Sequence, residues 1–305
     1  MNPGIAYVLG AFLLWGLFPL YFRLIGSVPA LDVVLHRYAW ALVTLAIVLA
    51  VLRRWQWIAI VRAQPRQLLV FLACALLLGA NSYAYVYAVH TQQVQQASLG
   101  YFINPLVNVL LGVLVLRERL SVPKWLAVGL AASGVAWLTW QLGTLPWIAL
   151  VLAFSFGFYG LLRKMAALGA LEGLALETLM LAPLVLPWIV IGIADGTDAL
   201  VQGDPWLAFW VVLVGPITVL PLALFAAGAR RLPLATVGLF QYISPTMQLL
   251  LAIWIFDEPF DGGRLVGFAL IWAGLAIVSA DALRQMLGKP AAAAPPAVPP
   301  VASGP

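Results

Sequence analysis

The sequence predicts an all-α integral membrane protein of ten transmembrane helices, arranged as two inverted five-helix repeats. Of its 305 residues, 64% are hydrophobic and only 9% are charged, and the mean hydropathy is +1.02. The chain divides into ten apolar stretches, each close to the roughly 20 residues that span a bilayer. Its second half repeats a pattern of the first at an offset of 140 residues. Soluble domains carry about 25% charged residues, so the composition excludes a soluble enzyme, a disordered chain and a disulfide-stapled scaffold.

The ten expected helices are separated by short segments rich in charged residues or turn formers. The closest two are divided only at residues 142–146, but a single helix through that point would be far longer than a bilayer requires. The first has no preceding Lys or Arg and no small-residue cleavage site, so we expect it to be retained. In order, the expected spans are residues 4–22, 33–52, 68–89, 97–116, 125–141, 145–162, 173–194, 206–228, 233–256 and 265–281.

Few residues are suited to metal binding or catalysis. Cys74 is the only cysteine, and His36 and His90 are the only histidines, which excludes an internal disulfide and a three-histidine zinc site. The sequence has no Gly-rich phosphate loop, no H-E-x-x-H and no G-x-S-x-G. We therefore expect no metal, no cofactor and no enzymatic activity. The alternative is an integral-membrane enzyme that acts on a lipid-soluble substrate.

The basic residues give the orientation. When alternate loops are assigned to opposite sides of the membrane, one side receives thirteen of the sixteen Lys and Arg residues. Asp195, Asp198, Asp204 and the acidic residues at 257, 258 and 261 gather on the other side. Loops rich in Lys and Arg stay on the cytoplasmic side of a membrane. We therefore expect an inner-membrane protein with both termini in the cytoplasm. The net charge of +5 is thus an orientation signal, and no nucleic-acid partner is expected.

The internal repeat relates residues 99–138 to residues 239–278. Besides apolar identities, it matches Pro105 with Pro245, Glu118 with Glu258 and Gly134 with Gly274. We expect a first five-helix repeat over residues 1–141, a second over 142–286 and a disordered Ala/Pro-rich tail over 287–305. Since five is odd, the two repeats have opposite orientations. Many secondary transporters share this architecture, with the binding site near the midplane between the repeats.

Several motifs resemble the drug/metabolite transporter superfamily, and within it the EamA-type RarD family. The most specific is residues 96–112, QASLGYFINPLVNVLLG, and others are residues 15–22, WGLFPLYF, and 241–245, QYISP. The likeness extends over residues 3–284 and implies a ten-helix inner-membrane permease linked to chloramphenicol sensitivity. Arg23, Asp32 and Ala41 replace the family's usual Lys, Glu and Ser. Ala41 removes a hydroxyl group, whereas the other two keep the charge.

The densest intramembrane polar cluster is Asp32, His36 and Arg37, with Arg23 at the end of the first span. Asp32 and His36 are four residues apart and share one helix face. Histidine changes charge near physiological pH, and the two arginines could attract an anionic group. The cluster is therefore predicted to be a substrate or proton site. The alternative is a structural ion-pair cluster that ties the first two helices together.

Other polar residues inside the spans need a reason, because burying them in lipid is unfavourable. Glu177 has no basic residue one turn away and is a candidate for proton coupling, as are His36 and Asp32. Asn81 and Tyr85 share one face of the third span and are predicted to contribute to substrate binding. Each could instead satisfy a neighbouring helix, and a tyrosine near a helix end is often an interface residue.

Two prolines occupy matching positions in the repeats. Pro105 and Pro245 each remove a backbone donor, and paired interruptions of this kind point to a transport site and to hinges. We expect the residues around them, Tyr101, Asn104, Gln241 and Tyr242, to contribute to substrate binding. The alternative is a bent helix whose amides bond to neighbouring helices.

The predicted function is secondary transport of a small metabolite or drug-like solute by alternating access, with protons as the candidate coupling ion. The expected partners are the solute and the lipid bilayer. Gly129/Ser133 and Ala269/Ala273 have the small-xxx-small spacing of close helix contacts, which suits packing within the chain or a weak homodimer. A monomer is the other expectation.

Overall fold

The computed structural model describes residues 3–91, 93–143, 145–202, 204–255 and 262–287, and all regular structure in these ranges is helical. The helices run as follows: α1 Pro3–Gly16, α2 Phe18–Leu24, α3 Ala30–Val51, α4 Gln56–Ala63, α5 Arg66–His90, α6 Val94–Leu114, α7 Val122–Leu142, α8 Trp147–Met165, α9 Ala170–Ala194, α10 Pro205–Ala229, α11 Leu234–Gln241, α12 Ile243–Trp254 and α13 Gly262–Leu287.

The predicted spans are confirmed. Nine stretches of the described chain are long and apolar enough to cross a membrane, with α1–α2 and α11–α12 each forming one, and α13 holds a shorter tenth, Leu265–Asp281. The close pair is divided as expected: Gly143 ends α7 with φ of 70°, a left-handed conformation that suits glycine. The prediction missed α4, which has eight residues, none of them buried, in the loop between two spans.

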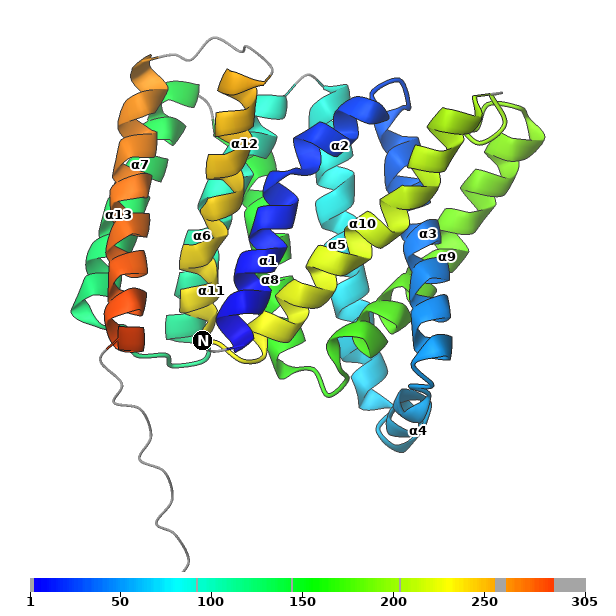
Figure 1. The fold of residues 1–305 in the computed structure, drawn as a ribbon, viewed down its shortest axis with the longest axis horizontal. Helices are drawn as coiled ribbons and strands as arrows, with labels where there is room; N and C mark the ends of the chain where they lie inside the picture. The colour runs from blue at the N-terminus through cyan, green and yellow to red at the C-terminus, as the bar shows by residue number, and fades with distance from the viewer. Residues whose placement is uncertain (1–2, 92, 144, 203, 256–261, 288–305) are drawn as a thin grey trace, which may run out of the picture.

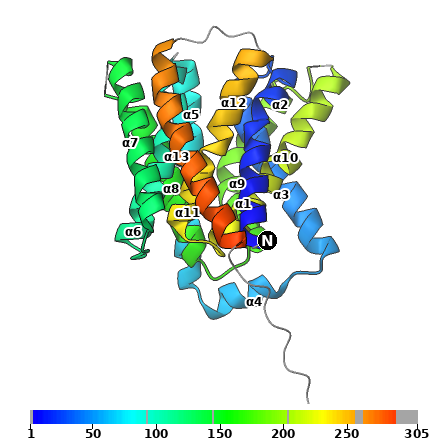
Figure 2. The same ribbon diagram turned by 60° about the vertical axis from the view of Figure 1, so that its left-hand side comes forward.

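The helices stand side by side, and successive spans alternate in direction (Figures 1 and 2). We call the face where α1 begins and α13 ends the terminal face, and the other the distal face. In Figure 1, α6 runs toward the terminal face, whereas its repeat counterpart α11–α12 runs toward the distal face. The two repeats are therefore inverted, as predicted.

The repeats meet through equivalent helices, since α6 packs against α11 and α7 against α13. A Cβ atom added to Gly134 would lie 2.5 Å from the backbone oxygen of Gly267. A Cβ added to Gly274 would lie 2.8 Å from the backbone oxygen of Ala127. The two contacts are equivalent, because the offset of 140 residues relates Gly134 to Gly274 and Ala127 to Gly267. The α7–α13 contact therefore follows the pseudo-two-fold axis, with backbones touching.

The small-residue pairs named from the sequence do not make this contact. Ser133, Ala269 and Ala273 are exposed, and nothing lies within 4 Å of a Cβ added to Gly129. They lie on the outer faces of α7 and α13, whereas Gly134 of α7 and Gly274 of α13 lie on the faces that contact each other. Packing within the chain uses Gly134, Gly267 and Gly274 instead.

The interrupted spans are not the matched pair expected. The span with Pro245 breaks at Tyr242, between α11 and α12, whereas α6 continues through Pro105. Pro245 lies in the first turn of α12, where its missing N–H leaves no helix bond unmade. Pro105 lies inside α6, which α8 braces closely: a Cβ on Gly157 would lie 2.6 Å from Val107. A second break, at Leu17, separates α1 from α2.

Some expectations concern residues outside the described ranges. They are the acidic group at 257, 258 and 261, including the Glu258 match, and the tail over 288–305. Leu287, counted with the tail, is the last residue of α13.

Candidate functional site

A cavity of about 230 Å³ lies between the repeats. Side chains of α1, α2, α3, α5, α6, α8, α10, α11 and α12 line it. Six of the predicted binding residues and one predicted hinge are among the lining residues: Arg37, Asn81, Tyr85, Tyr101, Asn104, Gln241 and Pro245. The remaining predicted residues, described below, are not.

Equivalent positions of the two repeats meet at this cavity. Tyr101 matches Gln241, and Asn104 matches Ser244, at the offset of 140 residues. All four line the cavity. Pro105, inside α6, frees the carbonyl of Tyr101 four residues earlier, and Pro245 lies in the first turn of α12. The cavity thus lies close to the pseudo-two-fold axis, beside both proline sites.

Buried amides connect the helices behind the lining. Asn108 donates to the Gln241 Oε1 at 2.8 Å and to the Asn104 Oδ1 at 3.2 Å. Asn104 donates to the backbone oxygen of Ala153 at 2.9 Å. Asn81 donates similarly to the backbone oxygen of Leu152 at 3.0 Å. These donors are therefore already occupied by the protein, which fixes the amide orientations.

Aromatic rings form the apolar side of the cavity. The rings of Trp15 and Phe156 lie edge to face with centroids 5.8 Å apart, and Phe12 lies 5.7 Å from Trp15. All three line the cavity, and all three rings contact Phe225 behind them. Phe225 stacks in turn on Tyr159, at 6.4 Å. This aromatic cluster fills the space between α1, α8 and α10.

Arg37 reaches the cavity from α3. Its Nη2 donates to the Ser82 Oγ at 2.6 Å and to the Tyr38 hydroxyl at 3.3 Å, and its Nε is buried without a partner among the described residues. No carboxylate in the described ranges lies within 4.0 Å of it. Arg37 is therefore oriented by neutral hydroxyl groups and not by a counter-charge.

His36 lies on α3 beside Arg37 but does not line the cavity. Its expected partner was Asp32, one turn away. Instead its Nε2 lies 3.1 Å from Asp198, in the loop between α9 and α10, and both side chains are buried. Asp32 is half-buried. Helix α3 directs His36 toward α9 and α10, so its partner is Asp198 from the loop between them and not Asp32 on its own helix.

Tyr242, predicted to bind substrate, also lies outside the cavity lining. It is buried, and its hydroxyl donates to the backbone oxygen of Phe102 at 3.1 Å. Phe102 is the residue that the repeat offset pairs with Tyr242. The ring packs against side chains of α7 and α13, so Tyr242 contributes to helix packing at the break between α11 and α12.

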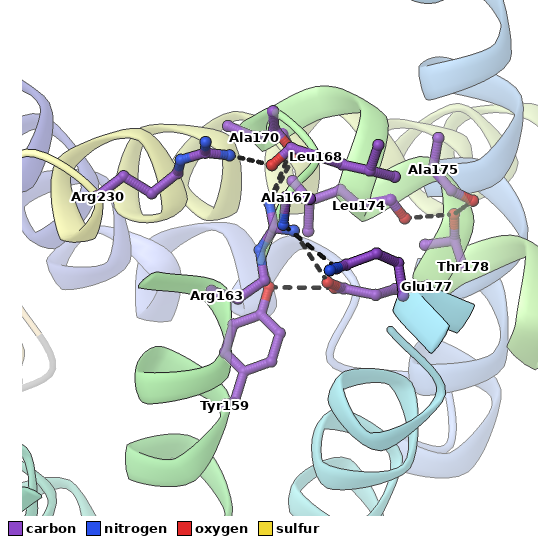
Figure 3. Close-up of polar contacts among 12 residues, drawn as sticks. Tyr159, Arg163, Ala167, Leu168, Ala170, Leu174, Ala175, Glu177, Thr178 and Arg230 are labelled. Carbon is purple, nitrogen blue, oxygen red and sulfur yellow. Dashed lines mark hydrogen bonds and ion pairs between the residues drawn. The ribbon is translucent and has the colours of Figure 1, made fainter. Parts of the chain in front are cut away.

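Glu177 lies deep in α9, where it forms an ion pair with Arg163 of α8 (Figure 3). The Arg163 Nη1 lies 3.3 Å from the Glu177 Oε1, and neither side chain has any exposed surface. The hydroxyl of Tyr159 donates to the Glu177 Oε2 at 3.2 Å. Glu177 therefore does not line the cavity. Tyr159 and Phe225 link it to the aromatic cluster.

Arg163 was counted among the loop charges on sequence grounds, but it is wholly buried. Its Nη2 donates to the backbone oxygens of Gly169 and Ala170, at 3.2 and 2.9 Å (Figure 3). Gly173 makes room, because a Cβ there would lie 1.9 Å from the Arg163 Nη1. The sequence does contain a signal for this pair. Arg163 lies at the end of one span, and Glu177 lies two turns into the next.

Contacts at the terminal face join the repeats. Glu118 accepts hydrogen bonds from the backbone N–H groups of Leu234, at 2.7 Å, and Ala235, at 2.9 Å, and so caps α11. Lys164 lies 3.6 Å from Glu118 and donates to the backbone oxygen of Leu232. These contacts hold the start of α11 against α6 and α8 on the side of the molecule away from the cavity.

The described ranges contain no group of three His, Cys, Asp or Glu side chains that could hold a metal ion. The site is instead a polar and aromatic cavity between inverted repeats, without a recognisable catalytic set.

Comparison with known proteins agrees with this arrangement. The model of the EamA-like transporter family matches residues 2–140 and again 145–280. A protein described as an uncharacterized transporter from Pseudomonas aeruginosa is 48% identical over 283 residues, covering 92% of this chain and 95% of its own. Protein RarD from Escherichia coli is 40% identical, covering 92% and 95%. A solved structure has a TM-score of 0.67 at 19% identity, covering 92% of this chain and 98% of its own, which supports the fold.

These likenesses extend over nearly the whole chain, and the relatives from Pseudomonas aeruginosa and Bacillus subtilis are named as transporters. They support a multi-pass membrane protein that transports a small-molecule solute, and RarD proteins are among its relatives. The two matches of the family model also fall on the two halves seen in the fold. The chain belongs to the EamA-like transporter family.

Proposed function

We propose that the protein is a secondary transporter that carries a small solute across the inner membrane by alternating access, as a monomer with both termini in the cytoplasm. One observation carries the proposal: the cavity is lined by equivalent positions of two inverted repeats, 101 with 241 and 104 with 244. A site on a pseudo-two-fold axis can be reached from either face when the repeats exchange conformations. The cavity is formed within one chain, which supports a monomer.

The cytoplasmic orientation rests on the charges of the terminal face. Arg54, Arg117, Arg119 and Arg231 are exposed in its loops, as expected for the side that retains basic residues. Toward this face the space below the cavity is filled by the aromatic cluster and by the Arg163–Glu177 pair. A state open to the cytoplasm would require these groups to move.

Proton coupling through His36, Glu177 and Asp32 is part of the proposal. His36 contacts Asp198, and Glu177 contacts Arg163, each in a buried pair. A change of protonation at His36 or Glu177 would change the charge of its pair and alter the contact between the helices. Each pair could therefore couple proton binding to helix movement, His36 toward the distal face and Glu177 toward the terminal face.

The direct experiment uses purified protein in liposomes, with a metabolite panel inside and mass spectrometry of the outside solution. We expect at least one solute to cross faster than from empty liposomes. Ser244→Trp fills the cavity and should reduce this flux by roughly tenfold or more. Ser133→Trp, the same change on an exposed face of α7, should leave it intact. Equal flux through both variants would contradict the assignment of the cavity.

A pH gradient then tests proton coupling. Glu177→Gln removes the titration and should abolish gradient-driven uptake while leaving solute exchange partly intact. His36→Gln should flatten the pH profile measured from the distal face, over roughly pH 5–8. If both variants respond to pH like the parent, coupling is absent or uses another ion. Turnover of a substrate in detergent, with no flux in vesicles, would instead favour the membrane enzyme.

A further inference from the structure

Arg37 is the one charged side chain among the cavity-lining residues of the described chain. Two other buried or half-buried cations in these ranges meet carboxylates, whereas the half-buried Lys124 donates to the Thr236 hydroxyl at 3.1 Å. Arg163 lies 3.3 Å from Glu177, and Lys164 lies 3.6 Å from Glu118. Arg37 has no such partner within 4.0 Å. A cation inside a span is unfavourable unless it is paired, so the missing counter-charge marks this position as different from the structural ion pairs.

The nearby carboxylates are already engaged or turned away. Asp198 is bound to His36 at 3.1 Å and accepts from the backbone N–H of Leu200 at 2.9 Å. Asp32, on the same helix as Arg37, does not come within ion-pair distance of it. The protein holds the guanidinium with Ser82 and Tyr38, which orient it without cancelling its charge.

Two buried groups of the lining have no partner in the described chain, and both can donate a hydrogen bond. A guanidinium has five N–H groups and no acceptor, and the Arg37 Nε is buried without a hydrogen-bond partner. The Thr218 hydroxyl of α10, also in the lining, is likewise buried and unpartnered in the described chain. By contrast, the amide donors of Asn81 and Asn104 are bonded to backbone oxygens. An uncompensated cation and unpartnered donor groups in the lining of one cavity favour a ligand with anionic oxygen atoms.

The lining also has an apolar, aromatic part. Trp15 and Phe156 present an edge-to-face pair, and Phe18 and Phe22 of α2 form another with centroids 5.6 Å apart. Aromatic walls bury flat apolar groups with favourable ring geometry. At about 230 Å³ the cavity is smaller than most ligand pockets, which are roughly 300–1,000 Å³, so the ligand is small.

We propose that the solute is a small aromatic or apolar monoanion, whose carboxylate-like head pairs with Arg37 and hydrogen-bonds to Thr218 while its body packs on the aromatic wall. This inference rests on the proposed function, because it names the substrate class of the same cavity. A neutral solute of equal size would leave the Arg37 charge uncompensated, and a cation would be repelled.

The test measures binding to the full-length protein in detergent micelles by isothermal titration calorimetry. The probes are 3-phenylpropionate, 3-phenylpropanamide and 3-phenylpropylammonium, which share a ring and differ in head-group charge. We expect the anion to bind roughly 10- to 100-fold more tightly than the amide, the range for hydrogen bonds to charged groups, and the cation not to bind. Arg37→Gln should remove the preference for the anion, and Arg37→Lys should keep part of it.

Two further variants make the test specific. Thr218→Val, which keeps the side-chain shape, should weaken binding of the anion by roughly 2- to 10-fold. Arg119→Gln removes the same charge from an exposed site on the terminal face and should bind like the parent. A thermal unfolding transition confirms that each variant is folded, and Arg37→Lys and Thr218→Val keep the test valid if Arg37→Gln does not fold.

Three results would overturn the inference: equal binding of anion and amide, an anion preference that survives Arg37→Gln, or no binding of any probe by the folded parent. Because binding in detergent needs no membrane, it is separable from transport. Flux of neutral solutes alone in liposomes, without anion binding, would refute the inference and leave the proposed function standing. Anion binding without flux of any solute would support the anion preference of the cavity and refute the proposed transport function.

Discussion

The buried pair of Arg163 and Glu177 permits a quantitative prediction. With an effective dielectric constant of about 20, two unit charges 3.3 Å apart attract each other by about 5 kcal/mol. Removing both charges from water offsets much of this gain. A substitution that deletes only one of the two charges is more destabilising, because the remaining charge stays buried without a counter-charge. We therefore expect Glu177→Gln to lower the free energy of unfolding by about 3–5 kcal/mol.

The chain offers a matched control on the same helix. Glu172 also lies 3.3 Å from an arginine, but its partner Arg54 is 56% exposed. Exposed pairs of this kind contribute about 0–1 kcal/mol, so Glu172→Gln should change stability little. The two substitutions are chemically identical and differ in the burial of the pair they disrupt.

Reversible unfolding by sodium dodecyl sulfate in mixed micelles measures both free energies. A double variant, Arg163→Met with Glu177→Leu, leaves no charge unpaired and should recover most of the stability lost in Glu177→Gln. If Glu177→Gln and Glu172→Gln have equal effects, or if the double variant is less stable than Glu177→Gln alone, the reasoning from burial is refuted.

Three further predictions concern contacts between the repeats. Gly134→Ala should destabilise the protein by about 1–3 kcal/mol through overpacking, whereas Gly129→Ala, with open space around it, should be neutral or stabilising; thermal unfolding of the two variants decides this. Asn108→Ala leaves the buried Gln241 oxygen without its donor and should lower the free energy of unfolding by about 1–3 kcal/mol, and a value near zero would show that water replaces the bond. Glu118→Ala removes the cap of α11 and should cost about 0.5–2 kcal/mol, with amide hydrogen exchange accelerated at the start of α11 and nowhere else in the second repeat.

The membrane-spanning helices could be predicted because hydropathy is a local property of the chain. The break at Gly143 illustrates this: a helix of limited length must end, and a glycine was available to end it. The short surface helix α4 could not be predicted in the same way. Its eight residues are too few for a hydropathy pattern to identify, and a segment that contains Arg62 between two spans is equally compatible with an irregular loop.

Part of the polar cavity lining could be predicted, because polar residues in lipid need partners. Asn104 and Gln241 were identified from this rule and from the repeat. The pairing of the charges could not be predicted. His36 meets Asp198 across 162 positions of sequence, and Arg163 reads as a loop residue until the fold places it against Glu177. Sequence spacing reports neighbours on one helix but not contacts between helices.

The backbone contact between α7 and α13 has a consequence for how the protein is made. Gly134 and Gly274 are 140 residues apart, and a ribosome adds roughly 5–20 residues per second, so α7 leaves the ribosome roughly 7–28 s before α13. α13 is the helix that α7 contacts most extensively. During that interval the Gly134 face of α7 has only lipid or provisional neighbours. The first repeat therefore completes its packing only when the final helix enters the membrane, and a chain that stops before α13 exposes an unsatisfied surface to the quality-control proteases of the bilayer.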